Sequence, residues 1–177
     1  MAQLIMHWKN DGADAVAPVL PEGITVKTFP EMPDAVNVWL DIVRFMSQAE
    51  SAPAGEDYYD RLMRNWPHYD ENMCYFLTVD GVPAATIAVV CNYPEKKGYI
   101  HMVACKPEFR GRRLGHLLND IALYTLKKEG METAHLTTDD WRIPAIKTYL
   151  KAGFTPDLES EPDFRERWDK IHSAINL

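Results

Sequence analysis

The chain predicts a mixed α/β protein built around one central sheet. Strand-like segments with alternating apolar residues are interspersed with segments whose apolar residues recur every three or four positions. Asp80-Gly81 is a strong two-residue hairpin signal, and a strand over 99–105 leads through a basic turn into a helix. At 177 residues the chain has room for one substantial core, so we expect a single domain over 1–177.

The expected elements can be placed along the chain from these periodicities and from turn residues. Helices are expected at 34–46, 56–66 and 114–128. A fourth helix, capped by Asp139 or Asp140, is expected to run through 151, and 157–177 is expected to hold a C-terminal amphipathic helix. Strands are expected at 3–8, 24–29, 74–79, 83–91, 99–105 and 133–138, with a short one from 154. The segment 47–55 is expected to be a polar loop.

Composition excludes several classes of function. A formal net charge of −7 argues against non-specific binding to nucleic acid or to an anionic membrane. The three cysteines are widely spaced and odd in number, which favours reduced thiols over a disulfide framework. The six histidines show no pair at ligand spacing, so no metal site is expected. No secretory leader or membrane-length apolar run is seen, and we expect a cytoplasmic protein.

Positive charge is concentrated at one turn of this acidic chain. Lys106, Arg110, Arg112 and Arg113 lie within eight residues, and the turn opens directly into the helix that starts at 114. The first N–H groups of a helix have no partner within it and carry partial positive charge, so this arrangement predicts a site for a phosphate-bearing ligand. In the preceding strand, alternation directs one set of side chains to one face: Tyr99, His101, Val103 and Cys105.

The stretch PEFRGRRLGHLL at 107–118 resembles the phosphate loop of the GCN5-related N-acetyltransferase family, which follows the pattern [QR]-x-x-G-x-[GA] after P-x-[YF]. It matches at Pro107, Phe109, Arg110 and Gly115 and departs at Arg113, where the family usually has glycine. If that position requires a positive φ, Arg113 is strained. Otherwise its N–H still donates and its guanidinium adds attraction to phosphate, which is the outcome we favour.

A second stretch, AIKTYLKAGF, resembles the family's downstream helix at Ala145, Tyr149, Gly153 and Phe154. The family often has asparagine seven residues before the tyrosine, whereas this chain has Arg142, which puts that cofactor contact in doubt. The resemblance covers 24–156 and is strongest over 99–154. Residues 1–23 are then an N-terminal strand and loop extension to this core.

The resemblance implies a mostly antiparallel sheet with one splayed parallel strand pair, around Val103 and Leu136, and helices on both faces. It also implies transfer of an acetyl group from acetyl-coenzyme A to a primary amine by direct attack in a ternary complex. Backbone groups of Val103 and Cys105 would contact the pantetheine arm, and the Val103 N–H would polarise the thioester carbonyl. The pyrophosphate would be held beside Arg110 by N–H groups of six residues: Gly111, Arg112, Arg113, Leu114, Gly115 and His116.

Two side chains are candidate catalysts by the same resemblance. Tyr149 would protonate the leaving thiolate, since a phenol of pKa ~10 can do so when placed at the sulfur. The alternative is a tyrosine that only packs on a helix face. His101 would remove a proton from the amine. Its alternatives are a buried histidine with a satisfied hydrogen bond, or a water chain lined by Tyr99.

The acceptor remains open at this stage. Aromatic and acidic residues mix at 56–60 and 67–72, which suits a small-molecule or peptide amine, although a solvated helix end explains the same pattern. Rival functions are a catalytically silent coenzyme A-binding regulator and an acyltransferase that uses another acyl group. A nucleic-acid module is disfavoured by the net charge. Oligomeric state is undetermined, with a homodimer among the options.

Overall fold

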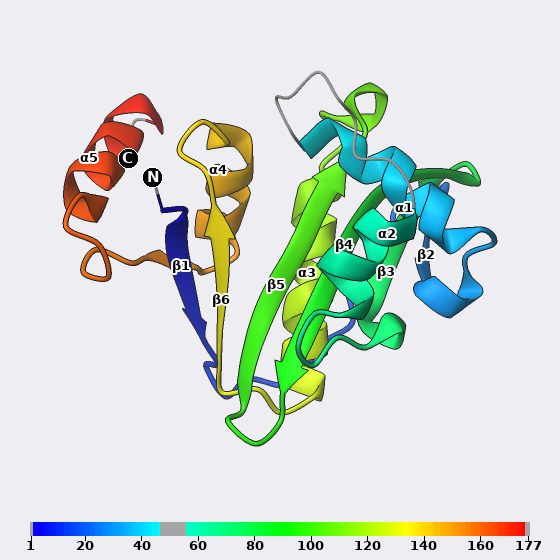
Figure 1. Ribbon diagram of the computed structural model, residues 1–177, viewed down its shortest axis with the longest axis horizontal. Coiled ribbons are helices and arrows are strands. Elements are labelled where there is room, and N and C mark those ends of the chain that lie inside the picture. Colours follow the sequence, from blue (N-terminus) through cyan, green and yellow to red (C-terminus); the bar gives the residue numbers. More distant parts are fainter. Residues whose placement is uncertain (1, 47–55, 176–177) are drawn as a thin grey trace.

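The computed structural model describes residues 2–46 and 56–175, whose strands join into a single sheet (Figure 1). Its strands are β1 (Leu4–Lys9), β2 (Ile24–Thr28), β3 (Cys74–Val79), β4 (Val82–Asn92), β5 (Lys97–Cys105), β6 (Thr133–Thr138) and β7 (Thr155–Pro156). The order across the sheet is β2-β3-β4-β5-β6-β1-β7. Within the described chain β5 and β6 pair in parallel and every other pair is antiparallel, which confirms the predicted sheet.

The helices also follow the predicted order. The α-helices are α1 (Ala35–Val43), α2 (Glu56–Tyr59), α3 (Leu114–Lys128), α4 (Ile143–Lys151) and α5 (Phe164–Ile175). Helix α2 continues as a π-helical turn, η3 (Asp60–Arg64), and short 3₁₀ turns are η1 (Phe29–Glu31), η2 (Arg44–Met46), η4 (Glu71–Met73) and η5 (Pro107–Phe109). The polar loop expected at 47–55 lies outside the described residues.

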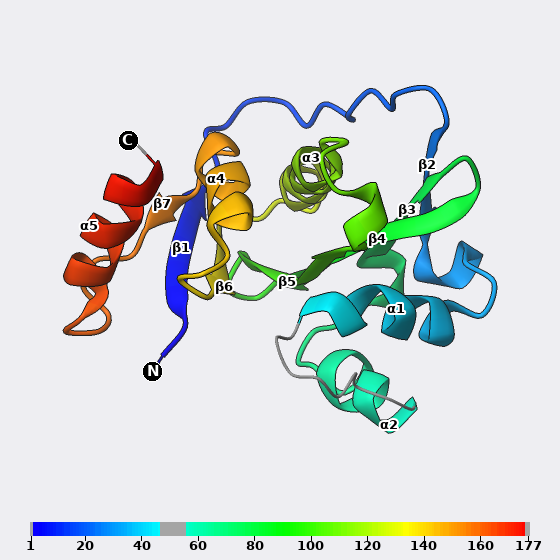
Figure 2. The ribbon, with the colours of Figure 1, turned by 90° about the horizontal axis from the view of Figure 1, so that it is seen from above.

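Helices cover the two faces of the sheet in separate layers (Figure 2). Helices α3 and α4 lie on one face, where Leu118 and Ile146 are fully buried; α1 and α2 lie on the other, where Trp39 and Tyr59 are buried. Each fully buried aliphatic side chain stabilises the fold by roughly 1.5–3 kcal/mol. Two cores therefore hold the central strands between them.

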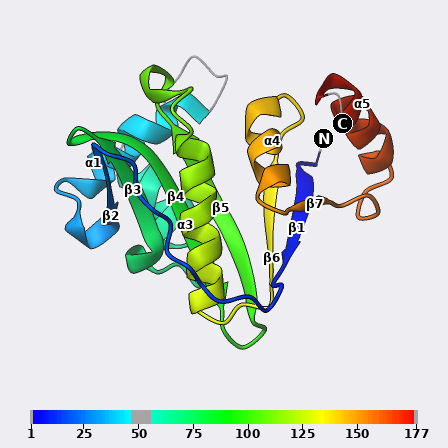
Figure 3. The same ribbon diagram turned by 180° about the vertical axis from the view of Figure 1, so that it is seen from behind.

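The N-terminal strand lies inside the sheet and not at its edge. Met6 pairs with Leu136 of β6 on one side and with Pro156 of β7 on the other. Residues 10–23 then cross the outer side of α3, in front of it in Figure 3, to reach β2 at the far edge. The strand expected at 3–8 is thus present, and it completes the half of the sheet that carries α4.

The expected cap of α4 is wrong. The helix begins at Ile143 with Arg142 as its N-cap and no side-chain cap bond. Asp140 instead pairs with the buried Arg167 of α5, whose Nε lies 3.0 Å from Asp140 Oδ2. Asp139 Oδ2 lies 2.9 Å from Arg142 Nε. Because both carboxylates are engaged in ion pairs with arginines, neither is left to cap the helix.

Candidate active site

Strands β5 and β6 separate from each other partway along their length. Their parallel pairing extends only from Lys97–Thr133 to Ile100–Leu136. Beyond these residues the two strands diverge and form the arms of a V, which opens toward the top of Figure 1. Backbone groups of β5 on that side are consequently released from pairing with β6, and a ligand can reach them.

A cavity of about 430 Å³ occupies the opening. Val103, Ala104 and Cys105 of β5 and Leu118 of α3 line it, together with Ala145, Thr148 and Tyr149 of α4. Phe45 and Met46, from the α1 side of the sheet, line it as well. This first cavity therefore lies between the splayed strands and is lined from both faces of the sheet.

A β-bulge in β5 sets which side chains face the first cavity. His101 pairs with Ala88 and Ala104 with Thr86, so two residues of β5, Met102 and Val103, face the single residue between those partners. Met102 has a φ of +52°, a conformation that costs a non-glycine residue about 1–2 kcal/mol. Strain of this kind is concentrated at functional sites.

The bulge shows that one prediction from the sequence, that four alternating side chains of β5 share one face, is wrong. Tyr99, His101, Val103 and Cys105 do not lie on the same face. The first two lie on the α2 side, where both stack with Trp66, whereas Val103 and Cys105 pack against the core beneath α3. The extra residue reverses the alternation of side chains after Met102, so His101 lies across the sheet from Val103.

The turn that precedes α3 is shaped for an anion. Gly111 has φ +80° and Arg113, the N-cap, has φ +61° with no side-chain cap bond. In the described chain the N–H groups of 111–115 have no hydrogen-bond partner, whereas the His116 N–H donates to the Arg113 carbonyl at 3.0 Å. Five of the six predicted N–H donors thus remain free, and the Arg110 side chain lines the first cavity beside them.

The structure contradicts the prediction that the backbone of Arg113 would be free of strain. Its backbone is left-handed, the conformation that glycine provides without steric cost. The guanidinium is exposed, so the side chain remains available to an anion, but the backbone is strained. The departure from the family pattern therefore has a structural cost.

Tyr149 lies in the wall of the first cavity. Its side chain is only 6% exposed, and no hydrogen bond to its hydroxyl is found among the described residues. Burial raises the pKa of Tyr149 to about 12; the nearby Arg142 charge opposes this rise and Tyr99 adds to it. The phenol is therefore held in its protonated form, without a partner, at the cavity surface.

His101 is buried on the opposite side. Its Nε2 lies 2.7 Å from the Leu62 carbonyl oxygen and must be the donor, because a carbonyl only accepts, so Nδ1 is the unprotonated nitrogen of the neutral ring. The Trp66 ring covers it at 4.2 Å between centroids. Burial lowers the pKa of His101, against the opposing effect of that hydrogen bond.

Sequence reasoning missed several residues of the first cavity. From the sequence, Arg142 was noted only because it replaces the asparagine that the family often has. In the structure its Nη2 donates to the Met46 carbonyl at 2.9 Å across the cavity, and its guanidinium lies 4.8 Å from the Trp141 ring centroid. The adjacent Trp141-Arg142 pair just before a helix was the available signal. Phe45 and Met46 carried none, because they reach the cavity from a distant element.

Other kinds of site receive no support from the described residues. They contain no group of three or more histidine, cysteine, aspartate or glutamate side chains arranged for a metal ion. Among the described helices, none combines the length and the hydropathy that crossing a membrane requires. The three cysteines are free thiols.

Comparison with known proteins identifies the family. A mycothiol acetyltransferase of Streptomyces griseus subsp. griseus is 33% identical over 146 residues, which cover 80% of this chain and 46% of that protein. The chain spans about half the length of the curated relatives it matches.

Solved structures share the fold. The GCN5-related N-acetyltransferase from Sphaerobacter thermophilus matches with a TM-score of 0.68 at 19% identity, over 89% of this chain and 50% of that one. N-acetylglutamate synthase from Neisseria gonorrhoeae, complexed with coenzyme A and N-acetyl-glutamate, has a TM-score of 0.57 at 13% identity, over 86% of this chain and 33% of that one. The model of the acetyltransferase (GNAT) family matches residues 39–154, and the chain therefore belongs to that family.

Proposed function

We propose that the protein is an acetyl-coenzyme A-dependent N-acetyltransferase that acts on a primary amine. The observation that carries this proposal is the first cavity, which lies between β5 and β6 with the protonated phenol of Tyr149 in its wall. Two substrates can meet there, one from each face. Direct transfer in a ternary complex requires such an arrangement.

The residues present suit coenzyme A. The five free N–H groups of 111–115 and the exposed guanidiniums of Arg112 and Arg113 would hold its pyrophosphate at the start of α3. Arg110 lines the first cavity next to them. Backbone groups of Val103 and Cys105 would contact the pantetheine arm, because this part of β5 has no β6 partner. When bound, acetyl-coenzyme A supplies the acetyl group as a thioester.

Tyr149 acts as the general acid in this proposal. The amine nitrogen forms a bond to the thioester carbonyl carbon while the carbon–sulfur bond breaks, so the leaving sulfur needs one proton. The phenol supplies it, and its raised pKa keeps that proton in place beforehand. The Val103 N–H, freed by the bulge and the splay, would donate to the carbonyl oxygen as negative charge develops there.

The proton lost by the amine goes to His101 or to water. His101 would accept it through Nδ1, since its Nε2 is engaged by Leu62. The ring is neutral near pH 7 because burial lowers its pKa, but the Trp66 ring covers it. A water chain past the Tyr99 hydroxyl is the other route, and a variant of His101 separates the two.

The relatives named mycothiol acetyltransferase make a mycothiol-related amine the first acceptor to test. A broad panel of small-molecule and peptide amines comes next, with release of free thiol as the measurement. Acetyl-coenzyme A at ~100 times its Kd should add about 2.7 kcal/mol to the free energy of unfolding. An unchanged melting temperature at saturation would exclude the cofactor; stabilisation without thiol release from any amine would favour a coenzyme A-binding regulator.

A Tyr149→Phe variant tests the acid. We expect kcat to fall by ~10²–10⁴-fold while stabilisation by acetyl-coenzyme A is retained. Tyr93→Phe is the matched control, because Tyr93 is 53% exposed and lies outside the first cavity. Full kcat in Tyr149→Phe would remove the tyrosine from the mechanism. Propionyl-coenzyme A in the same assay shows whether another acyl group is preferred.

A further inference from the structure

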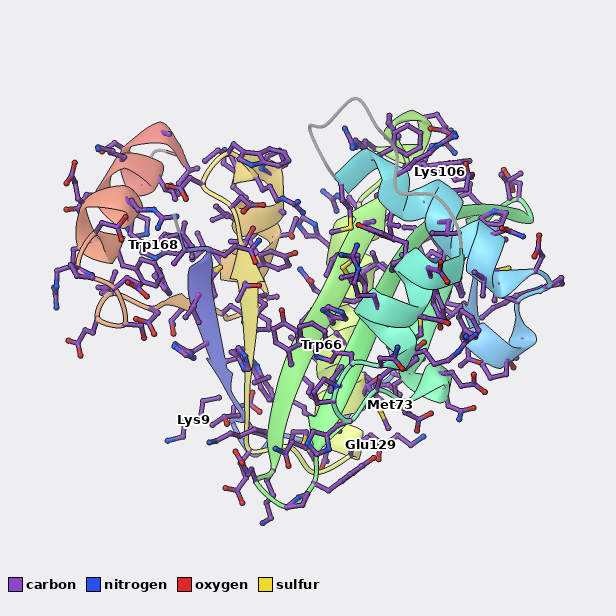
Figure 4. The ribbon with its side chains drawn as sticks, viewed as in Figure 1. Lys9, Trp66, Met73, Lys106, Glu129 and Trp168 are labelled. Atoms are coloured by element: carbon purple, nitrogen blue, oxygen red, sulfur yellow. The ribbon has the colours of Figure 1, made fainter. Side chains whose placement is uncertain are left out.

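A second cavity, of about 340 Å³, lies on the α2 face of the sheet below the point where β5 and β6 diverge. Trp66, Tyr99, His135 and Thr137 line it, together with residues of the β4–β5 turn. Trp66 is seen over β5 in Figure 4. The volume lies in the range of small-molecule sites.

The second cavity has a continuous aromatic wall. Trp66 and Tyr99 stack with ring centroids 5.8 Å apart and planes 14° apart. His135 extends this wall from β6, 4.7 Å from the Tyr99 ring, and His101 supports Trp66 from beneath at 4.2 Å. Because His101 is itself bonded to the Leu62 carbonyl, the wall is fixed before any ligand arrives.

The wall carries little net charge. Burial lowers the pKa of both His101 and His135, so both rings are neutral near pH 7. The one carboxylate and the one ammonium that line the second cavity in the described chain, Glu95 and Lys97, pair with each other at 3.0 Å. Such a surface stacks with an uncharged ring, and Asn92 and His68, which also line the cavity, offer hydrogen bonds to polar groups on it.

The two cavities approach each other where the strands diverge. The Tyr99 hydroxyl lies 3.1 Å from the hydroxyl of Thr137, the first residue of β6 beyond the end of the β5–β6 ladder. Tyr99 also contributes to the raised pKa of Tyr149, which lines the first cavity. Tyr99 and Val103 are about 13 Å apart along a strand that rises ~3.3 Å per residue. A ring stacked on Tyr99 therefore needs an extended arm along β5 to bring its amine to the first cavity.

From this arrangement we propose that the second cavity is the acceptor site, and that the acceptor is an amine whose non-reacting part is an uncharged ring stacked on Trp66 and Tyr99. The inference rests on the proposed acetyl transfer, because an acceptor site presupposes that reaction. An aromatic ring and a sugar ring both offer a flat apolar face to such a wall, and the experiment distinguishes them.

The test uses the full chain and primary amines that differ in the ring they carry and in the length of the arm. Tyramine and phenylbutylamine present an aromatic ring, aminoethyl glucoside a sugar ring, and aminopentanol no ring; the para-carboxylate analogue of phenethylamine adds a charge. We expect at least one ring amine to exceed aminopentanol by ~10-fold or more in kcat/KM, and the carboxylate to lose most of that advantage. The ring class with the higher kcat/KM shows whether the acceptor carries an aromatic ring or a sugar ring.

Variants of Trp66 test whether the preference for ring amines over open-chain amines arises in the second cavity. Trp66→Leu should raise KM for the ring amine ~10-fold relative to KM for aminopentanol and should retain the stabilisation by acetyl-coenzyme A, while Trp66→Phe should retain most of the preference. Tyr93→Leu, an exposed aromatic residue outside both cavities, is the control. Equal rates for ring and open-chain amines, or an equal loss for all amines in Trp66→Leu, would overturn the inference.

Binding without chemistry separates this inference from the proposed function. If no amine releases thiol, calorimetric titration with tyramine and aminoethyl glucoside still reports on the second cavity. Binding by the wild-type protein and by Trp66→Phe, lost in Trp66→Leu, supports the ring site even though acetyl transfer fails. If neither ligand binds, the ring site is wrong. Thiol release from open-chain amines alone would sustain acetyl transfer and overturn the ring site.

Discussion

Arg142 Nη2 lies 2.9 Å from the Met46 carbonyl oxygen, and this bond joins the start of α4 to the end of η2 across the first cavity. Nε of the same guanidinium lies 2.9 Å from Asp139 Oδ2. Two elements that belong to opposite arms of the V are thereby held at a set separation. The position resembles one at which the family often has asparagine, a shorter side chain with no charge.

Arg142→Gln should weaken the binding of acetyl-coenzyme A. The variant loses the link to Met46 and the charge beside Tyr149, so we expect KM for acetyl-coenzyme A to rise ~10-fold, equivalent to about 1.4 kcal/mol. Steady-state thiol release measures it. Arg165→Gln removes an exposed pair on α5, in which Arg165 lies 3.3 Å from Glu159, and should change nothing. Equal KM values in Arg142→Gln and wild type would show that the link does not shape the cavity.

Arg113→Gly should stabilise the protein. Glycine adopts the observed φ of +61° without steric cost, which recovers about 1–2 kcal/mol, partly offset by the greater freedom of the unfolded chain. A net gain of about 0.5–1 kcal/mol corresponds to a rise of roughly 1–4 °C in Tm. Differential scanning calorimetry measures the change. Arg112→Gly is the matched control, since Arg112 is an adjacent arginine outside the left-handed region, and it should not raise Tm.

His101→Gln should flatten the dependence of stability on pH. The pKa of His101 is lowered in the folded protein, so below the unfolded value of 6.5 the unfolded chain binds a proton that the folded chain does not. Stability from this group is therefore complete above that value and is lost as the pH falls through the folded pKa. Urea unfolding between about pH 7.5 and 5.5 tests this, with a contribution of up to about 1.4 kcal/mol per pH unit.

The same experiment on His135→Gln gives a comparison, because partial burial lowers the pKa of His135 as well, although more of this residue is in contact with solvent than of His101. We expect a smaller flattening there. Glutamine can still donate to the Leu62 carbonyl, so the His101 variant should fold. An unaltered slope in His101→Gln would mean that the ring is protonated in the folded state as readily as in the unfolded chain.

Gly98→Ala should destabilise the closed end of the V. A Cβ at this position would lie 2.1 Å from Leu126 Cδ2 and 3.2 Å from Ala134 Cβ, so the buried Leu126 side chain would have to change its rotamer or α3 would have to move away from β5. Overpacking of this kind costs about 1–3 kcal/mol in the free energy of unfolding. The double variant Gly98→Ala/Leu126→Val should recover part of the loss. If the two single losses simply add, the clash is not what destabilises the protein.

The sequence predicted local features well. The basic turn, α3 over 114–128 and β6 over 133–138 were placed correctly, because their periodicity and flanking residues are strong. The bulge at Met102 was not predictable, since the alternation from Tyr99 to Cys105 is unbroken and the bulge depends on the partner strand. Asp139 and Asp140 were plausible caps, but Asp139 pairs with the neighbouring Arg142 and Asp140 with the distant Arg167 of α5.

The candidate site was predicted in the same uneven way. Tyr149 and the turn before α3 lie in short motifs, so their positions could be read directly from the chain. The stack of Trp66 on Tyr99 and His101 joins residues more than thirty positions apart, and no local pattern indicates it. The aromatic residues near 56–72 suggested an acceptor region, but only the tertiary structure shows which of them meets β5.

The place of β1 has a consequence for how the protein is made. Leu4, Met6 and Trp8 are synthesised well before their partners in β6 and β7. At ~5–20 residues per second, this apolar strand waits on the order of ten seconds without a partner. The arm that carries Tyr149 therefore assembles late, and slow translation would lengthen the time for which these apolar side chains are exposed to solvent.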